Sequence, residues 1–554
     1  MNPLIKVDHL YLHFENQQNK NTLSNVSFQL EHNESMLILG PSGCGKSTLT
    51  FCLNGLYPRE LDGEMGGDIF INGRKTTNYR PGEISQSVGV VFQDPETQFC
   101  MLTVEDEVAF GLENICVPHE VMDEKVDEAL RLVNMLSYKR STITSLSGGQ
   151  KQKLALACIL ALEPSLLILD EPTANLDPIA SKDLISTIHA LKNKTNCALI
   201  IIEHQLDGWV ELADRSLLLN RDGEVFYDGS LRHAVDSMLP QIEEQGVWLP
   251  KVTQYVLNQK GFPNQFIPLT IQEFLDRPYH LDSSGWETVK NVRQTNDIFI
   301  DASTISWSNR HRDILRDVSL QIYKGEFIAI IGANGSGKTS LSRILAGIQK
   351  PTTGTIHVRG KALKSWKESH LRAEVGYVFQ NPEHQFITNT VFDEVAFSLR
   401  LKEYPQKDIS EKVEGILETC RLSQHKDDHP YSLSQGQKRR LSVATMMIDN
   451  QNMLLLDEPT FGQDAQSNLE LMKLLEDRHS QGTTMVVITH DMEIVHHYAT
   501  RVVVLNEGRV VADCSPLELW EKSISLLQQW QLDLPVFVQL KNSEKEAYYV
   551  STSS

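Results

Sequence analysis

The chain has 554 residues, a hydrophobic fraction of 41% and a formal net charge of −20 at pH 7. This length exceeds one ordinary domain of about 150 residues, and the acidic balance argues against a phosphate backbone as the main partner. No apolar run reaches the roughly 20 residues of a membrane helix, and the N-terminus lacks a signal pattern. The eight cysteines are scattered. We therefore expect a cytoplasmic chain with reduced cysteines.

The chain contains the same series of motifs twice. A glycine-rich loop that ends at Lys46 recurs at Lys338, and four later blocks recur in the same order at a separation of 287 residues. These blocks begin at Val91 and Val378, Glu107 and Glu394, Leu146 and Leu433, and Leu169 and Leu456. A shared order at nearly constant spacing predicts a duplicated domain.

The repeat extends beyond these motifs, because Leu249-Pro250 is matched by Leu534-Pro535. Each half is therefore expected to carry a small C-terminal extension. The joint between the halves is expected near Ser283–Asp297, and Tyr548–Ser554 reads as a frayed end. The predicted organisation is a first domain over residues 1–235, its extension and a linker over 236–296, a second domain over 297–515 and a second extension over 516–554.

Short continuous runs of Ile, Leu and Val precede the motifs in each half. Met36–Leu39 and Phe327–Ile331 lead into the glycine loops, and Leu166–Leu169 leads into an acidic pair. Such runs are typical of strands buried on both faces of a parallel sheet. Leu217–Tyr227, with Asp222-Gly223 inside it, predicts an antiparallel hairpin.

The two glycine-rich loops match the pattern G-x-x-x-x-G-K-[ST], which is suited to phosphate. Its glycines let backbone N–H groups converge on the anion at the start of the following helix. A lone match can be a chance glycine turn, but here two matches in register each follow an apolar run. The lysines are expected to reach the β- and γ-phosphates and the following hydroxyls to contact Mg²⁺. The candidate nucleotide-binding residues of the loops are Gly40, Pro41, Ser42, Gly43, Cys44, Gly45, Lys46, Ser47 and Thr48, and Gly332, Ala333, Asn334, Gly335, Ser336, Gly337, Lys338, Thr339 and Ser340.

An acidic pair ends an apolar run in each half, at Asp170-Glu171 and at Asp457-Glu458. The aspartate is expected to hold Mg²⁺ through water, and the glutamate to polarise the attacking water as a general base. A solvated acidic turn is the plain alternative for one such pair. It does not account for two copies that are each followed by Pro-Thr.

The segments Leu-Ser-Gly-Gly-Gln and Leu-Ser-Gln-Gly-Gln suit a helix N-terminus capped by serine. Together with the glycine loop, Gln93 and Gln380, the acidic pair, and His204 and His490, they resemble the ATP-binding-cassette ATPase family over nearly the whole chain. The resemblance implies an α/β fold of two tandem P-loop domains. Each would have a doubly wound core sheet, an antiparallel β subdomain and a helical subdomain that carries the signature.

In this family each ATP lies between the glycine loop of one cassette and the signature of the other. Carried onto this sequence, the resemblance implies that ATP on Lys46 is closed by Ser434, Gly436 and Gln437, and ATP on Lys338 by Ser147, Gly149 and Gln150. The expected catalytic residues are Glu171, Glu458, His204 and His490, and the expected Mg²⁺ ligands are Ser47, Gln93, Asp170, Thr339, Gln380 and Asp457.

Aromatic residues occur early in each half, at Phe14 and Trp307, where the family stacks a ring on adenine. Packing in the core is the alternative, because an early aromatic residue on a strand is ordinary. Three positions depart from the family pattern: Gln435 in the second signature, Glu203 before the first histidine, and Gln463. None removes a lysine, a catalytic glutamate or a histidine, so two hydrolytic sites are expected, of equal or unequal rate.

The segments Gln93–Phe99 and Gln380–Phe386 resemble those of the ATPases of energy-coupling-factor importers, which take up vitamins and metals. In that group the following helix forms a groove for a coupling helix of the transmembrane scaffold. The resemblance implies a peripheral protein on the cytoplasmic side of the cell membrane. Its partners would be a scaffold and a substrate-binding membrane subunit in separate chains, its cofactors ATP and Mg²⁺, and its cargo a vitamin, a vitamin precursor or a metal ion. A fused pair is similar to the subset associated with hydroxymethylpyrimidine/thiamine import.

Because both cassettes share one chain, they can pair within a monomer, and no nucleic acid partner is expected. The competing class is a tandem cassette that does not transport, such as an F-subfamily translation factor with a long charged helical linker. Residues 236–296 instead contain Trp248, Tyr255, several prolines and mixed charge. A third class, the tandem ATPases of sugar importers, usually has one eroded site, whereas both sites here retain their motifs.

Overall fold

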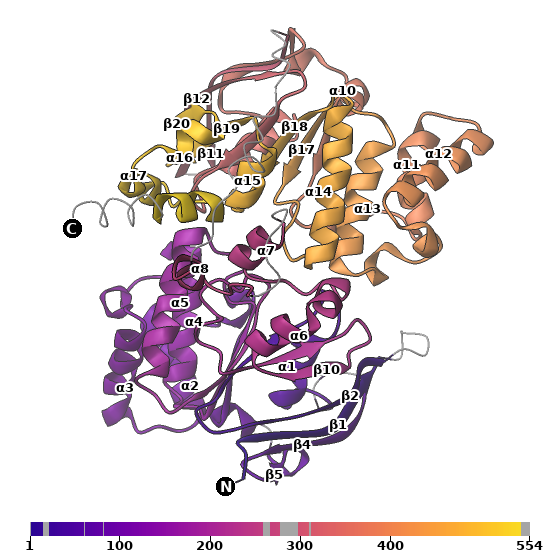
Figure 1. Cartoon of the computed structure of the whole chain (residues 1–554). Coiled ribbons are helices and arrows are strands. Elements are labelled where there is room, and N and C mark those ends of the chain that lie inside the picture. The colour runs from indigo at the N-terminus through magenta and orange to yellow at the C-terminus, as the bar shows by residue number, and fades with distance from the viewer. Residues whose placement is uncertain are drawn as a thin grey trace. The chain divides into compact units, whose positions relative to one another are not determined.

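A computed structural model describes residues 2–14, 21–59, 61, 63–80, 82–258, 266–277, 297–309 and 312–543. It divides into two compact units, Met1–Tyr279 with Asp464–Gln466, and His280–Gln463 with Ser467–Ser554 (Figure 1). The expected joint near Ser283–Asp297 lies outside the described residues except for Asp297, and the end Tyr548–Ser554 lies wholly outside them.

In the described part of the first unit, the strands form a four-stranded sheet of order β2-β1-β4-β5 and a six-stranded sheet of order β10-β9-β3-β8-β7-β6. The smaller sheet is antiparallel, and the larger is parallel except for its edge strand β10. The strands are β1 (Ile5–His13), β2 (Asn21–Leu30), β3 (Ser35–Leu39), β4 (Glu64–Ile71), β5 (Arg74–Lys75), β6 (Val88–Val91), β7 (Leu166–Asp170), β8 (Ala198–Ile202), β9 (Arg215–Leu219) and β10 (Val225–Gly229).

The helices of the first unit fall into groups by their place along the chain. Helix α1 follows the glycine loop, α2 to α4 pack on one another as a helical subdomain, and α6 to α8 follow the last strand. Their bounds are α1 (Lys46–Leu53), α2 (Val104–Asn114), α3 (His119–Leu132), α4 (Gly148–Leu160), α5 (Pro178–Lys192), α6 (Leu231–Glu244), α7 (Lys251–Leu257) and α8 (Ile271–Leu275).

The second unit repeats this plan, with sheets of order β12-β11-β14-β15 and β16-β17-β18-β13-β19-β20. Its strands are β11 (Ile298–Asn309), β12 (Arg312–Tyr323), β13 (Phe327–Ile331), β14 (Thr353–Val358), β15 (Lys361–Ala362), β16 (Val375–Val378), β17 (Met453–Asp457), β18 (Thr484–Ile488), β19 (Arg501–Asn506) and β20 (Arg509–Cys514). Its helices are α9 (Lys338–Leu345), α10 (Glu368–Glu374), α11 (Val391–Leu401), α12 (Gln406–Thr419), α13 (Gln435–Met447), α14 (Ala465–Ser480), α15 (Met492–Tyr498), α16 (Pro516–Trp520) and α17 (Ile524–Gln529). The predicted fold class is confirmed for both halves.

The apolar runs are continuous because the core strands are buried on both faces. In β3, Met36 and Ile38 belong to a cluster shared with the antiparallel sheet and α1. Leu37 and Leu39 belong to a second cluster, shared with the helical subdomain. Side chains alternate between the faces of a strand, so a core strand between two such clusters needs an apolar residue at every position. Because β3 and β7 both pair in parallel with β8, their carboxyl ends, which carry the motifs, lie at one edge of the sheet.

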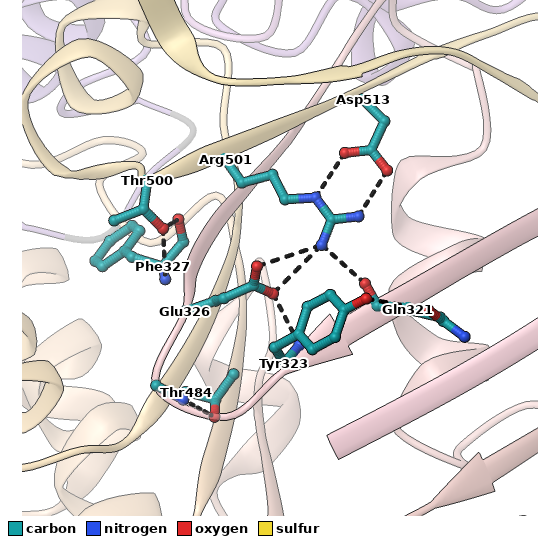
Figure 2. A network of polar contacts seen from close by, with 9 residues as sticks. Gln321, Tyr323, Glu326, Phe327, Thr484, Thr500, Arg501 and Asp513 are labelled. Atoms are coloured by element: carbon teal, nitrogen blue, oxygen red, sulfur yellow. Dashed lines mark hydrogen bonds and ion pairs between the residues drawn. The ribbon is translucent and has the colours of Figure 1, made fainter. Parts of the chain in front are cut away.

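An arginine at the start of the last parallel strand ties three elements together in each unit. Figure 2 shows Arg501 of β19 bound to Asp513 of β20 by two hydrogen bonds of 2.6 Å, and to Glu326, which precedes β13, and the Gln321 carbonyl of β12. In the first unit Arg215 makes the same contacts, with Asp228, Glu34 and the Gln29 carbonyl. The guanidinium group has several N–H donors in one plane, so it can bond to more than one acceptor at once. The arginine therefore joins the antiparallel sheet to the core sheet.

The segment that follows the last strand packs on the core of its own unit. Ile242, Val247 and Leu249 belong to the same buried cluster as the helical subdomain of the first unit. The repeated Leu-Pro turn is closed identically in both halves: the Gln254 side chain donates to the Leu249 carbonyl, and Gln539 to the Leu534 carbonyl, each at 2.6 Å. The Leu-Pro turn of the two extensions therefore has the same local structure.

Candidate functional site

In each unit the glycine loop joins a buried strand to a helix and wraps around the amine of its lysine. Lys46 Nζ donates to the carbonyls of Gly40 (2.8 Å) and Pro41 (2.9 Å), and Lys338 Nζ to those of Gly332 and Ala333, both at 2.8 Å. Both lysines are buried. A buried ammonium group needs hydrogen-bond acceptors, and here the loop carbonyls supply them. They hold the amine close to the N-terminus of the following helix.

Glycine is required where the loop enters the helix. Gly45 has a φ of 97°, and a Cβ atom there would lie 2.7 Å from Leu23 Cδ2. Its counterpart Gly337 has a φ of 103° and would meet Leu315 Cδ2 at the same distance. A left-handed backbone without space for a side chain admits only glycine. The first N–H groups of α1 and α9 have no partners within the helix and are thus available to an anion.

The hydroxyl after each lysine contacts the aspartate at the end of β7 or β17, which is separated by one strand from the strand that leads into the loop. Ser47 Oγ donates to Asp170 Oδ1 at 3.1 Å, and Thr339 Oγ1 to Asp457 Oδ1 at 3.3 Å. Burial, together with the adjacent Glu171, raises the pKa of Asp170 to about 6. Burial and Glu458 likewise raise the pKa of Asp457. Each aspartate therefore lacks a full counter-charge in the protein alone.

The glutamate after each aspartate points toward a histidine from the next strand. His204 Nε2 lies 2.9 Å from Glu171 Oε1, and His490 Nε2 lies 3.0 Å from Glu458 Oε1. Gln93 Nε2 also donates to Glu171 Oε2 at 3.0 Å. Burial alone would raise the pKa of Glu171, but the charge and hydrogen bond of His204 hold it below its ordinary value. Glu171 is thus an ionised carboxylate although it is largely buried.

Both glutamates have a left-handed backbone, with a φ of 48° at Glu171 and 47° at Glu458. Non-glycine residues in this region cost on the order of 1–3 kcal/mol. Strain that recurs at the same position of two repeats, beside a paired histidine, indicates a functional constraint on where the carboxylate points.

The second unit has a cavity of about 300 Å³ above these groups. Ten of its lining residues were predicted from the sequence: Asn334, Gly335, Gly337, Lys338, Thr339, Ser340, Gln380, Asp457, Glu458 and His490. Three were missed, Arg312, Ile314 and Ile488, because a strand start and two apolar strand residues carry no motif.

The two early aromatic residues both pack against other side chains. Trp307 is partly buried against a core cluster of the second unit. Phe14 contacts Tyr57 edge to face, with 5.8 Å between the ring centroids. Their stacking on adenine stays a prediction.

The signature serines cap the first helix of the motif in both units. Ser147 and Gln150 form a capping box at the start of α4, and Ser434 and Gln437 form one at the start of α13. Gly149 and Gly436 lie in the first turn of the same helices, and Gln435 occupies a helical position that the cap tolerates. The signatures therefore present helix N-termini, each in the helical subdomain of its own unit.

Two side chains behind the site differ between the halves. Glu203 is buried and accepts hydrogen bonds from the Thr173 amide (2.9 Å) and hydroxyl, and burial raises its pKa to about 8. In the second unit the corresponding Thr489 caps a turn at Asp491 instead. Tyr377, by contrast, donates to Asp457 Oδ2 at 3.2 Å. The sequence marked Glu203 as a departure, whereas Tyr377 sits inside an apolar run and gave no signal.

Comparison with known proteins agrees with this geometry. A family model described as "ABC transporter" matches residues 23–174 and 315–461. "Putative HMP/thiamine import ATP-binding protein YkoD" of Bacillus subtilis (strain 168) is 39% identical over 98% of this chain and 97% of its own length. A "Putative ABC transporter ATP-binding protein" of Methanosarcina acetivorans is 35% identical over 90% of this chain and 84% of its own. The solved structure of cbiO1 from Clostridium perfringens, described as part of the ABC transporter complex cbiONQ, is 31% identical, with a TM-score of 0.39 over 44% of this chain and 99% of that one.

This chain belongs to the ABC transporter family, of which it carries two ATPase modules in tandem. It binds and hydrolyses ATP as the ATP-binding component of such a transporter. Among the described residues, every helix falls short of the length and apolar character needed to cross a bilayer.

Proposed function

We propose that this chain is the energy-coupling ATPase of an importer of the energy-coupling-factor type, with one hydrolytic site on each unit. The observation that carries the proposal is the repeated juxtaposition of three elements at one sheet edge. These are a looped lysine, a hydroxyl–aspartate pair and a glutamate–histidine pair. Two intact copies support hydrolysis at both sites, as expected from the sequence.

In each site we assign the phosphates of ATP to the glycine loop. The helix N-terminus and the lysine supply positive charge, and the loop carbonyls that hold Lys46 and Lys338 release the amine to the phosphate. Glu171 and Glu458 act as the bases that orient and deprotonate the attacking water. His204 and His490 hold these carboxylates and lie beside the γ-phosphate, and Gln93 restrains Glu171 from the other side.

The hydroxyl–aspartate pairs fit Mg²⁺. Thr339 Oγ1 and Asp457 Oδ1 are hard oxygen donors 3.3 Å apart, and the described residues contain no cluster of three acidic, histidine or cysteine side chains that could hold a metal by itself. Mg²⁺ is usually bound by one or two protein oxygens together with substrate phosphates and waters. Ser47, Asp170, Thr339 and Asp457 would hold the ion, with Gln93 and Gln380 nearby, and the ion would neutralise charge on the phosphates.

We further propose that each nucleotide is closed by the opposite signature, Ser434–Gln437 over Lys46 and Ser147–Gln150 over Lys338. The helix N-termini at both signatures support this assignment, because the N–H groups of the first turn that the serine cap does not bind can face an anion. The covalent link raises the effective concentration of one domain near the other, so a monomer suffices. Residues 1–235 and 297–515 would be the paired ATPase domains.

A groove in the second unit is the proposed docking site for a short helix of an integral membrane subunit. It has a volume of about 450 Å³, and its lining includes Ile387, Phe397 and Leu401. Ile387 is 65% exposed and Leu401 is 71% exposed. Large apolar side chains that are exposed together on a surface are typical of sites that bind a partner. Its charged residues Asp393 and Arg400 pair with each other at 2.6 Å, so an apolar helix face is the occupant that fits. The protein would thereby be peripheral, on the cytoplasmic side of the membrane.

The groove is joined to the signature helix by a glutamine. Gln385 Nε2 donates to the Ser442 carbonyl (2.9 Å) and to Thr445 Oγ1 (2.6 Å) of α13, and Ser442 Oγ donates back at 2.7 Å. Glu394 also accepts from the amides of Ile387 and Thr388, which fixes the groove wall. Movement of the signature on ATP binding would therefore be transmitted to the docked helix.

The class of cargo is proposed from likeness alone: a vitamin, a vitamin precursor or a metal ion. The name of the Bacillus subtilis relative supports an HMP/thiamine compound. No residue discussed above would touch the cargo, which the membrane subunits would bind.

Affinity purification from membranes in mild detergent tests the docking proposal. The intact chain should co-purify with a membrane scaffold and a small substrate-binding membrane protein. Leu401→Asp should weaken this association, because it places a charge in the groove, whereas Leu517→Asp, at another exposed apolar position, should leave it unchanged. Co-purification of ribosomes in place of membrane proteins would refute the transport function.

A further inference from the structure

The two sites differ in how the aspartate of each acidic pair is held. In the second unit Asp457 accepts two side-chain hydrogen bonds, from Thr339 on Oδ1 (3.3 Å) and from Tyr377 on Oδ2 (3.2 Å). In the described residues of the first unit, Ser47 on Oδ1 is the side-chain donor to Asp170. The residue that corresponds to Tyr377, 287 positions earlier, is Val90, which has no hydroxyl.

Tyr377 is itself fixed by polar neighbours. Ser342 Oγ lies 3.1 Å from its hydroxyl, and Ser342 Oγ also donates to the Thr339 carbonyl at 2.9 Å. The Arg343 guanidinium interacts with the same hydroxyl. Tyr377 is 4% exposed, so its ring cannot turn away without disturbing the core. The phenol is a donor at neutral pH, and its position is determined by packing as well as by hydrogen bonds.

The first unit replaces this polar group with apolar contacts. Phe51 stands where the second unit has Arg343, and its ring lies 5.6 Å from that of Phe92 and 6.3 Å from that of Tyr57. Thr50, which corresponds to Ser342, has a buried hydroxyl without a hydrogen-bond partner. The difference therefore involves three positions, not a single side chain.

We propose that Tyr377 is a positioning residue of the second site, whose hydroxyl holds Asp457 in the orientation that receives Mg²⁺, and that the first site lacks this device. The inference rests on the proposed role of Asp457 in holding the ion. A carboxylate restrained at one oxygen loses less freedom when its other oxygen becomes a ligand, because second-shell hydrogen bonds orient metal ligands. The second site should therefore bind Mg²⁺-nucleotide at lower free Mg²⁺ than the first.

The test separates the sites with single lysine variants and measures binding, not turnover. Lys46→Ala leaves the second site to bind nucleotide, and Lys338→Ala leaves the first. Fluorescent MANT-ADP is titrated at a series of free Mg²⁺ concentrations and again in EDTA. Adding Tyr377→Phe to Lys46→Ala should raise the half-saturating Mg²⁺ concentration about two- to tenfold, the range for one lost hydrogen bond. The affinity in EDTA should stay the same.

Tyr323→Phe in the same background is the matched control, because its hydroxyl bonds to Gln321 on the surface of the same unit. Thermal unfolding checks that each variant is folded. An unchanged Mg²⁺ dependence in Tyr377→Phe would overturn the positioning role. If neither lysine variant binds MANT-ADP at any Mg²⁺ concentration, the proposed function itself fails.

Discussion

The two units carry the same reacting groups, but different side chains stand behind them. In the first, Glu203, which follows β8 and precedes His204, is tied to the segment after the acidic pair through hydrogen bonds from Thr173. In the second, the stabilising contact comes from the other side of the site, where Tyr377 holds Asp457. A duplicated enzyme can thus keep its chemistry while each copy reinforces a different member of the site.

The glutamines after the two sites show the same divergence. Gln385 binds the signature helix α13 through Ser442 and Thr445. Its counterpart Gln98 instead accepts from the Phe92 amide and donates to the Val90 carbonyl of β6, at 3.1 and 3.0 Å. The glutamine of this region is therefore bonded to the signature helix in one half and to the core sheet in the other, whereas an ion pair to the signature helix is present in both, from Lys151 to Glu96 and from Lys438 to Glu383. We expect the two halves to respond unequally to a membrane partner.

The largest expected effect is on hydrolysis. Glu171→Gln with Glu458→Gln should lower ATP turnover by about a hundredfold or more, because general-base catalysis contributes at least that much. Each single variant should lose part of the activity, and Glu458→Gln more of it, since Asp457 is the better-held aspartate. Steady-state phosphate release measures this, with Glu124→Gln on the exposed face of α3 as control. A single variant with full activity would show that its site is idle.

An intermediate effect is expected from the two glutamines. Gln385→Ala leaves buried partners on α13 unsatisfied, which costs about 1–3 kcal/mol, and should speed amide hydrogen exchange in the second half of α13, where Ser442 and Thr445 lie. Gln98→Ala should speed exchange around β6 and leave α4 unchanged. Hydrogen exchange read by mass spectrometry compares the two variants directly. Equal effects on α4 and α13 would contradict the difference between the halves.

The smallest expected effect is a pH dependence of stability from Glu203. Burial raises its pKa in the folded state to about 8, above the ordinary value of about 4.3 for glutamate. The folded state therefore binds the proton more tightly, and stability is lost as pH rises from about 4 through 8. Glu203→Thr, which copies Thr489, should flatten this decline in thermal unfolding of the first unit. The same slope in both proteins would contradict it.

The sequence predicted the parts of the site that are written as contiguous motifs. The glycine loops, both acidic pairs and both histidines lie where their strands end, because parallel strands bring their carboxyl ends to one edge. The contact of Tyr377 could not be predicted, because it depends on β16 pairing with β17 in a register that sets Tyr377 beside Leu455. Glu203 was visible as an unusual residue, but its partner Thr173 becomes a neighbour only through the pairing of β7 with β8.

Replacing Lys46 and Lys338 together with alanine shows whether nucleotide is turned over at the two lysine-bearing loops. We expect the folded double variant to hydrolyse ATP no faster than a protein-free control, while each single variant keeps measurable turnover. Undiminished turnover in the double variant would place hydrolysis outside these two loops.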